Sequence, residues 1–134
     1  MAMPDRNQAN LLTVYLLEHV NAIRTRQLGL LGRMAGIRVA GSGASAATEI
    51  AGLMRHRPDV VLISLGTGYA HALQEVRTLR SMLPHTIVIV LADNLGPPLR
   101  RACLKAGGSY CFDKTLELDA LRLVMAGLAA TSRP

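Results

Sequence analysis

The sequence predicts an α/β protein built on a doubly wound parallel sheet, and two features of the chain predict it. Five short runs of strand length, rich in β-branched and aliphatic residues, alternate with five stretches in which apolar residues recur at helical spacing. The run from Pro58 to Leu65 is apolar nearly throughout, which is typical of a central strand covered on both faces. Such alternation predicts parallel strands joined by right-handed helical crossovers.

Glycine, proline and capping residues set the expected limits of these elements. The predicted strands cover residues 13–17, 37–40, 59–65, 86–91 and 109–112. The predicted helices cover residues 21–35, 45–56, 70–82 and 96–106, followed by a last helix that starts near residue 115. Gly36 and Pro84 end the first and third helices, while Ser45 and Thr115 are expected N-caps. The Gly-Ser-Gly sequence at 41–43 is expected to form a loop.

The length and composition predict one domain with an aliphatic core. The chain has 134 residues, half of them apolar and only 3% aromatic. We expect a flexible N-terminal segment at residues 1–12 and a single domain at residues 13–130. The apolar run at 11–17 is too short to span a membrane, and no targeting signal is evident. Cys103 and Cys111 lack metal-ligand spacing and suit a reducing compartment, so a cytoplasmic location is expected.

The positive net charge of the chain does not by itself indicate that it binds nucleic acid. Lys and Arg number 15 against 9 acidic residues, a net charge of +6, but the basic residues are scattered and few aromatics are available for stacking. No DNA-binding motif is present. The charge therefore indicates a solvated surface rather than a nucleic-acid footprint.

Three stretches of the chain carry a family resemblance. They are Pro-Asp-Val-Val-Leu-Ile-Ser-Leu at 58–65, Arg-Arg-Ala-Cys-Leu at 100–104 and Phe-Asp-Lys-Thr-Leu-Glu-Leu-Asp-Ala-Leu at 112–121. Together with the five alternations, they resemble the receiver domain of two-component response regulators, of the small single-domain type. The resemblance covers about residues 13–128. It implies a flavodoxin-like fold with strand order 2-1-3-4-5 and helices on both faces.

The resemblance also implies where a phosphorylation site would stand, and most of its parts are missing. Receiver domains use two acids after the first strand, a phosphoacceptor aspartate, a Thr or Ser, and a lysine. The matching positions in this chain are Glu18 and His19, Ser64, Ala92, and Lys114. The aromatic switch residue of the family is replaced by Cys111, which lies between Tyr110 and Phe112.

The chemistry of these residues predicts a pseudo-receiver. Ser64 has no carboxylate with which to form an acyl phosphate, and His19 is a poor ligand for Mg²⁺, which usually takes carboxylates. Glu18 and Lys114 can neutralise each other without a metal. We therefore expect no catalytic residue, metal or cofactor, and a signalling role through phosphorylation-independent contacts with a sensor kinase or another regulator.

Several alternatives remain open at this point. The chain could be a phosphorelay receiver with a non-standard acceptor, or bind a small molecule or nucleotide at the carboxyl edge of the sheet. Ser64 with His19 as base would suit a hydrolase, but no acid partner or oxyanion hole is evident. Residues 41–46 match a GxGxxA dinucleotide pattern, although they follow the second strand rather than the first, so a plain turn is the expected structure.

The last helix predicts an interface. Besides the stripe expected to face the core, it carries a second apolar stripe on the side expected to face water. This second stripe comprises Leu116, Ala120, Leu123, Gly127 and Ala130. We expect a homodimer through this helix, since two-fold dimers are the commonest closed assemblies. A basic ridge that includes Arg100 and Arg101 is expected at its rim.

Overall fold

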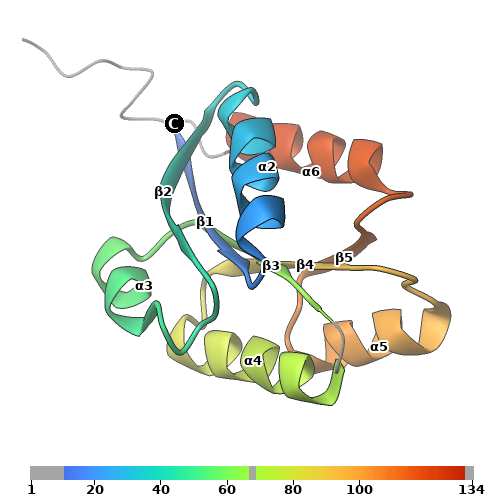
Figure 1. Ribbon diagram of the computed structural model, residues 1–134. Coiled ribbons are helices and arrows are strands. Elements are labelled where there is room, and N and C mark those ends of the chain that lie inside the picture. Colours follow the sequence, from blue (N-terminus) through green and yellow to red (C-terminus); the bar gives the residue numbers. More distant parts are fainter. Residues whose placement is uncertain (1–10, 67–68, 132–134) are drawn as a thin grey trace, which may run out of the picture.

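The computed structural model, which describes residues 11–66 and 69–131, contains a five-stranded parallel sheet in the order β2-β1-β3-β4-β5 (Figure 1). The strands are β1 (Leu12–Glu18), β2 (Ile37–Gly43), β3 (Val60–Ser64), β4 (Ile87–Ala92) and β5 (Tyr110–Asp113). The helices are α2 (Asn21–Gly32), α3 (Ile50–His56), α4 (Tyr69–Met82), α5 (Pro97–Ala106) and α6 (Leu118–Thr131). The predicted fold class and strand order are confirmed.

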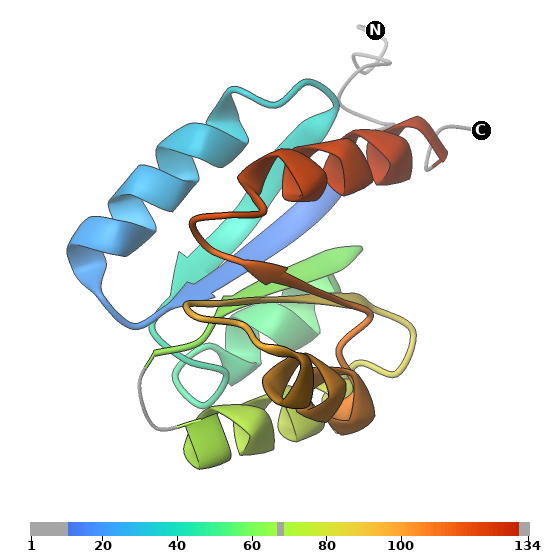
Figure 2. The same ribbon diagram turned by 90° about the vertical axis from the view of Figure 1, so that its right-hand side faces the viewer.

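Helices cover both faces of the sheet, and two apolar clusters hold the layers together. Helices α2 and α6 lie on one face, and α3, α4 and α5 lie on the other (Figures 1 and 2). Leu31 of α2 and Met125 of α6 pack against alternate residues of the central strands, such as Leu16. The neighbouring strand residue Leu17 points the other way, into a cluster with Leu53 of α3. This alternation follows from the two-residue period of a strand.

The second strand and the following helix differ from the prediction. Residues 41–43 were expected to form a loop, but they continue β2, which pairs with β1 through Leu17 after a register shift at Ala40. Ser45 does not cap α3: its side chain bonds with Thr48 in a turn, and the helix begins only at Ile50. Propensity alone misplaces this segment because the pairing with β1 overrides the two glycines.

The side chain of Tyr15 leaves room only for glycine at position 41 of β2 and position 52 of α3. Its hydroxyl donates a hydrogen bond of 2.6 Å to Glu49, and burial together with this bond raises the pKa of Tyr15 to about 12. A Cβ atom on Gly41 would lie 2.6 Å from the ring, and one on Gly52 would lie 2.4 Å from the hydroxyl. The ring therefore occupies space that any larger residue at either position would fill.

Arg80 joins α4 to the turn that follows it and to the turn that follows α5. Its guanidinium donates to the carbonyl oxygens of Thr86 at 2.7 Å, Pro84 at 3.0 Å and Gly107 at 2.9 Å. Gly107 ends α5 with a φ of 122°, a conformation that favours glycine. One side chain thus ties the end of α5 to the start of β4.

The two ends of the described chain also refine the prediction. The segment at 1–12 falls outside the described residues except for its last two positions, and Leu12 already belongs to β1. Helix α6 begins at Leu118, so Thr115 does not cap it; instead, Asp113 accepts hydrogen bonds from the backbone of Thr115 and Leu116 at 2.9 Å each. No helix in the described ranges is long and apolar enough to cross a membrane.

Candidate functional site

The predicted pocket residues gather at the carboxyl edge of the sheet because the parallel strands end there together. Glu18, Ser64 and Ala92 are the last residues of β1, β3 and β4, and Lys114 directly follows β5. Glu18 is paired with Ser64 in the register of the sheet, and the Lys114 backbone bonds to the carbonyl oxygen of Ala92 at 3.0 Å. The positions taken from the family resemblance thus meet at one edge.

Glu18 is the charged centre of this edge. Only 1% of its surface is exposed, while its carboxylate accepts a hydrogen bond of 3.0 Å from the Val20 backbone and lies 3.5 Å from the Lys114 ammonium. Burial alone would raise the pKa of Glu18, but hydrogen bonds from Ser64 and Val20 and the charge of Lys114 hold it below its ordinary value. Glu18 is therefore an ionised, neutralised group and a weak base.

Gln27 is a member of this site that the sequence analysis missed. Its side-chain nitrogen donates a 3.3 Å hydrogen bond to the Ser64 hydroxyl. The Ser64 hydroxyl in turn donates a hydrogen bond to the Glu18 carboxylate. The Gln27 carbonyl oxygen is buried without a partner among the described residues. Nothing in the sequence singles out this glutamine from the other polar residues of α2, because only the packing of α2 on the sheet brings it to Ser64.

In the described part of the chain, the side chains of the remaining predicted members make no hydrogen bond or ion pair with Glu18, Ser64 or Lys114. His19 is exposed, and Ala92 is wholly buried in the apolar layer beneath α4 and α5. Cys111, at the switch position, is also buried there beside Cys103; their contact lowers the pKa of Cys103 and raises that of Cys111. The thiols thus occupy a core position.

The donor set does not fit Mg²⁺, the ion that receiver domains bind. A hard divalent cation prefers several oxygen ligands, and carboxylates above all. Here Glu18 supplies the one carboxylate among the matched positions, and both of its oxygens are already engaged by Val20 and Lys114. Among the described residues, no three acidic, histidine or cysteine side chains are grouped so as to hold a metal.

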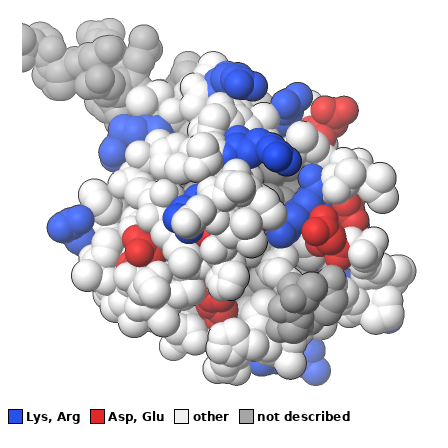
Figure 3. All heavy atoms as spheres, viewed as in Figure 1, with Lys and Arg blue, Asp and Glu red and all other residues white. Residues whose placement is uncertain are grey.

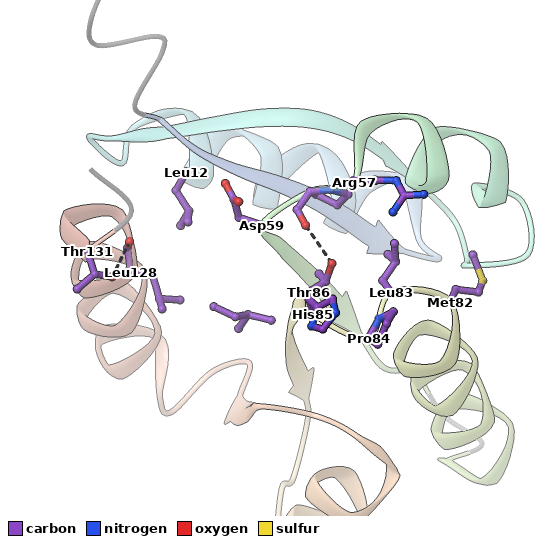
Figure 4. Close-up of a pocket in the computed structure, with 12 residues that line it drawn as sticks. Leu12, Arg57, Asp59, Met82, Leu83, Pro84, His85, Thr86, Leu128 and Thr131 are labelled. Atoms are coloured by element: carbon purple, nitrogen blue, oxygen red, sulfur yellow. Dashed lines mark hydrogen bonds between the residues drawn. The ribbon is translucent and has the colours of Figure 1, made fainter. Parts of the chain in front are cut away.

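A pocket lies at the other edge of the sheet, away from these residues. It has a volume of about 440 Å³ and opens at the amino ends of the strands (Figure 4). Its apolar lining includes Leu12, Ile87 and Leu128. In Figure 4, Leu12 and Leu128 lie on one side of the pocket, and Thr86, whose hydroxyl donates to the Pro58 carbonyl oxygen, lies on the other. At the carboxyl edge, where a ligand was considered from the sequence, the Glu18 carboxylate contacts the side chains of Ser64 and Lys114.

The predicted interface is exposed in part. Leu116 and Leu123 are 84% and 75% exposed, and Gly127 and Ala130 are exposed as well. The expectation for Ala120 was wrong, because it is half-buried against the core beneath α6.

The basic ridge also differs from the prediction. Arg101 is exposed, but Arg100 is engaged: its guanidinium bonds to the Cys111 carbonyl oxygen at 2.6 Å and to Glu117 at 2.5 Å. Arg100 therefore ties α5 to the start of α6 rather than forming a free rim.

Several solved structures with the same arrangement are response regulators. A LuxR-family two-component response regulator from Aurantimonas sp. SI85-9A1 has a TM-score of 0.79 at 18% identity, covering 92% of this chain and 88% of that one. A response regulator from Thermotoga maritima has a TM-score of 0.74 at 22% identity, over 90% and 98% of the two chains. The chain has the receiver-domain fold.

Other comparisons limit what the shared fold says about function. A candidate pilus assembly-related protein from Burkholderia pseudomallei K96243 shares the receiver-like fold, with a TM-score of 0.77 at 14% identity over 100% of this chain and 98% of that one. No family model and no curated protein matches the sequence. At these identities the likeness establishes the fold, and the chemistry of the site must be argued from its residues.

Proposed function

We propose that this protein is a signal-transduction module of the response-regulator type that works without aspartyl phosphorylation. The observation that carries the proposal is the last residue of β3, where Ser64 stands at the position of the phosphoacceptor. A hydroxyl cannot form the acyl phosphate of a receiver domain. The module therefore acts through protein contacts and is not an enzyme.

The surroundings of Ser64 support this proposal. Ser64 is 6% exposed, and its hydroxyl bonds to the side chains of Gln27 and Glu18. The carboxylate that would help to bind a metal in a working receiver is neutralised by Lys114 instead. Ala92 offers no hydroxyl to follow a phosphoryl group. The contacts at this edge therefore need neither a phosphoryl group nor a metal ion to balance the charges.

The proposal predicts that restoring the acceptor alone does not restore a switch. Ser64→Asp would place a second carboxylate beside Glu18, but Ala92 and His19 would still lack the required groups. Addition of beryllofluoride and Mg²⁺ to this variant should leave the backbone amide spectrum of α5 and α6 unchanged. Chemical-shift changes across these helices would show that the remaining residues suffice for switching and would contradict the proposal.

We further propose that the exposed side of α6 forms a homodimer contact. Leu116, just before α6, and Leu123 on α6 are the most exposed large apolar residues described, and Gly127 within α6 would allow another helix to approach closely. Exposed apolar side chains grouped in this way mark an interface more often than a solvated face. The partner in this contact is a second copy of the chain.

Leu123→Glu should convert the dimer into a folded monomer, because the charge would be buried at the contact without a partner. Sedimentation velocity at high micromolar concentration measures the change, and circular dichroism checks the fold. Ile50→Glu is the matched control, since Ile50 is also exposed but lies on α3, across the sheet. A monomeric wild type, or equal dissociation by both variants, would argue against this interface.

A further inference from the structure

A groove runs between the end of α2 and the middle of α6, on the face opposite α4 and α5. It has a volume of about 320 Å³. Leu30, Met34, Ile37 and Ala126 give it an apolar lining, and Arg33 and Arg122 stand among the residues that border it. The volume is at the lower limit of small-molecule pockets, about 300–1,000 Å³. It admits a few apolar side chains rather than a whole cofactor.

The charge around this groove is strongly one-sided. No acidic residue occurs between Glu18 and Glu49, a stretch that includes all of α2. Arg26 precedes Leu30 by one helical turn and so lies on the same stripe of α2 as the groove. Figure 3 shows basic side chains gathered on the half of the molecule that α2 and α6 cover. The groove therefore sits in a positive field.

Asp119, which pairs with Arg122 at the border of the groove, compensates little of this positive charge. Asp119 lies 3.9 Å from Arg122, and the two side chains are 98% and 51% exposed. A pair at this distance and with this exposure is weakly held, because water screens both charges. Arg122 remains available to a second carboxylate.

From this arrangement we infer that the α2–α6 groove docks an acidic amphipathic helix of a partner protein. Two helices bordering an apolar groove accept a third helix through side chains spaced at i, i+3 or i+4, and i+7. Acidic residues flanking that apolar stripe would meet Arg33 and Arg122, and would steer the encounter. The inference rests on the proposed function in one respect, because it names the chemistry of the protein partner.

Other occupants suit the groove less well. A second copy of the chain docked face to face would set arginines against arginines. Nucleic acid would use the positive field but not the apolar lining, and this surface has no exposed aromatic side chain for stacking among the residues named here. An acidic helix uses both the apolar lining and the charge.

Binding of a designed peptide tests the inference. The probe is a fluorescent helical peptide of about 14 residues, or four turns, with leucine at the spacing above and glutamate on both flanks. A second peptide carries lysine in place of every glutamate. We expect the acidic peptide to bind the full chain and to shift the methyl signals of Leu30, Met34 and Ile37, and we expect no binding of the basic peptide.

Charge reversal supplies the decisive control. Arg33→Glu with Arg122→Glu should weaken binding of the acidic peptide on the order of tenfold or more and allow the basic peptide to bind. Arg77→Glu with Lys105→Glu makes the same change of net charge on the exposed surface of α4 and α5 and should have little effect. Circular dichroism confirms that both variants fold.

Three results would overturn the inference. They are absence of binding by the acidic peptide, equal weakening by both pairs of substitutions, and equal binding of a peptide whose leucines are replaced by serine. Binding of phosphatidylglycerol vesicles that depends on Arg33 and Arg122, without peptide binding, would assign the surface to anionic lipid instead. None of these outcomes bears on phosphorylation, so the proposed function and this inference can fail separately.

Discussion

Lys114→Met should lower the free energy of unfolding by about 3 kcal/mol, because it leaves the Glu18 carboxylate buried without its counter-charge. The Glu18 side chain is 2% exposed and that of Lys114 is 14% exposed, so water screens the pair weakly. Glu18→Gln combined with Lys114→Met should cost less than Lys114→Met alone. The double variant no longer buries a charge, and glutamine can still accept the Val20 hydrogen bond.

Urea denaturation of the two single variants and the double variant measures the coupling. Asp119→Asn with Arg122→Met is the matched control, since that pair is exposed and should change stability by less than about 1 kcal/mol. Additive, near-zero changes at Glu18 and Lys114 would mean that the two groups do not stabilise each other.

The Glu18–Lys114 pair also makes the stability of the folded chain depend on pH. Because the pKa of Glu18 is lowered in the folded chain, its contribution is present above the unfolded value, about 4.3, and is lost as the pH falls through the folded value. Lys114→Met removes one cause of the lowering and brings the folded pKa closer to the unfolded one. The stability lost through Glu18 on acidification, measured by urea denaturation at several pH values, should therefore be smaller than in the wild type.

Arg80→Met should also destabilise the chain by about 3 kcal/mol, since hydrogen bonds from a charged donor contribute more than neutral ones and several carbonyl oxygens would lose theirs. The Arg80 guanidinium donates to the carbonyl oxygens of Pro84 and Thr86, in the turn between α4 and β4, and of Gly107, which follows α5. Lysine should not substitute, because an ammonium cannot reproduce the planar fork of donors.

Arg77 is the matched control for Arg80 on the same helix. It is exposed and makes a side-chain bond of 3.3 Å to Gln74, so Arg77→Met should change stability by less than about 0.5 kcal/mol. Chemical denaturation of the three variants decides the matter. Equal stability of Arg80→Met and Arg77→Met would show that water replaces the Arg80 contacts without cost.

Much of this fold could be predicted from the sequence because local patterns agree with the packing. The apolar run at 58–65 becomes β3, at the centre of the sheet, and Pro84 and Gly107 lie where helices end. The second strand was predicted too short because the register shift at Ala40 and the approach of Tyr15 to Gly41 depend on the neighbouring strand. Such tertiary contacts leave no periodic signal in the chain.

The site was predictable in position but not in its contacts. The ends of β1, β3 and β4 follow from the strand patterns, so Glu18, Ser64 and Ala92 could be placed together. The role of Gln27 depends on how α2 rotates against the sheet, and the engagement of Arg100 by Glu117 depends on the turn before α6. These features arise only when separate elements pack, and a single sequence does not encode them in any local motif.

Intact-mass spectrometry after incubation with acetyl phosphate and Mg²⁺ tests the central claim most directly. The account predicts an unchanged mass, because Ser64 cannot form an acyl phosphate and the carboxylate beside it is engaged by Lys114. A receiver domain with an intact acceptor aspartate, treated in parallel, should gain one phosphoryl group. A phosphoryl adduct on this chain at Ser64, His19 or any other residue of the carboxyl edge would contradict the account.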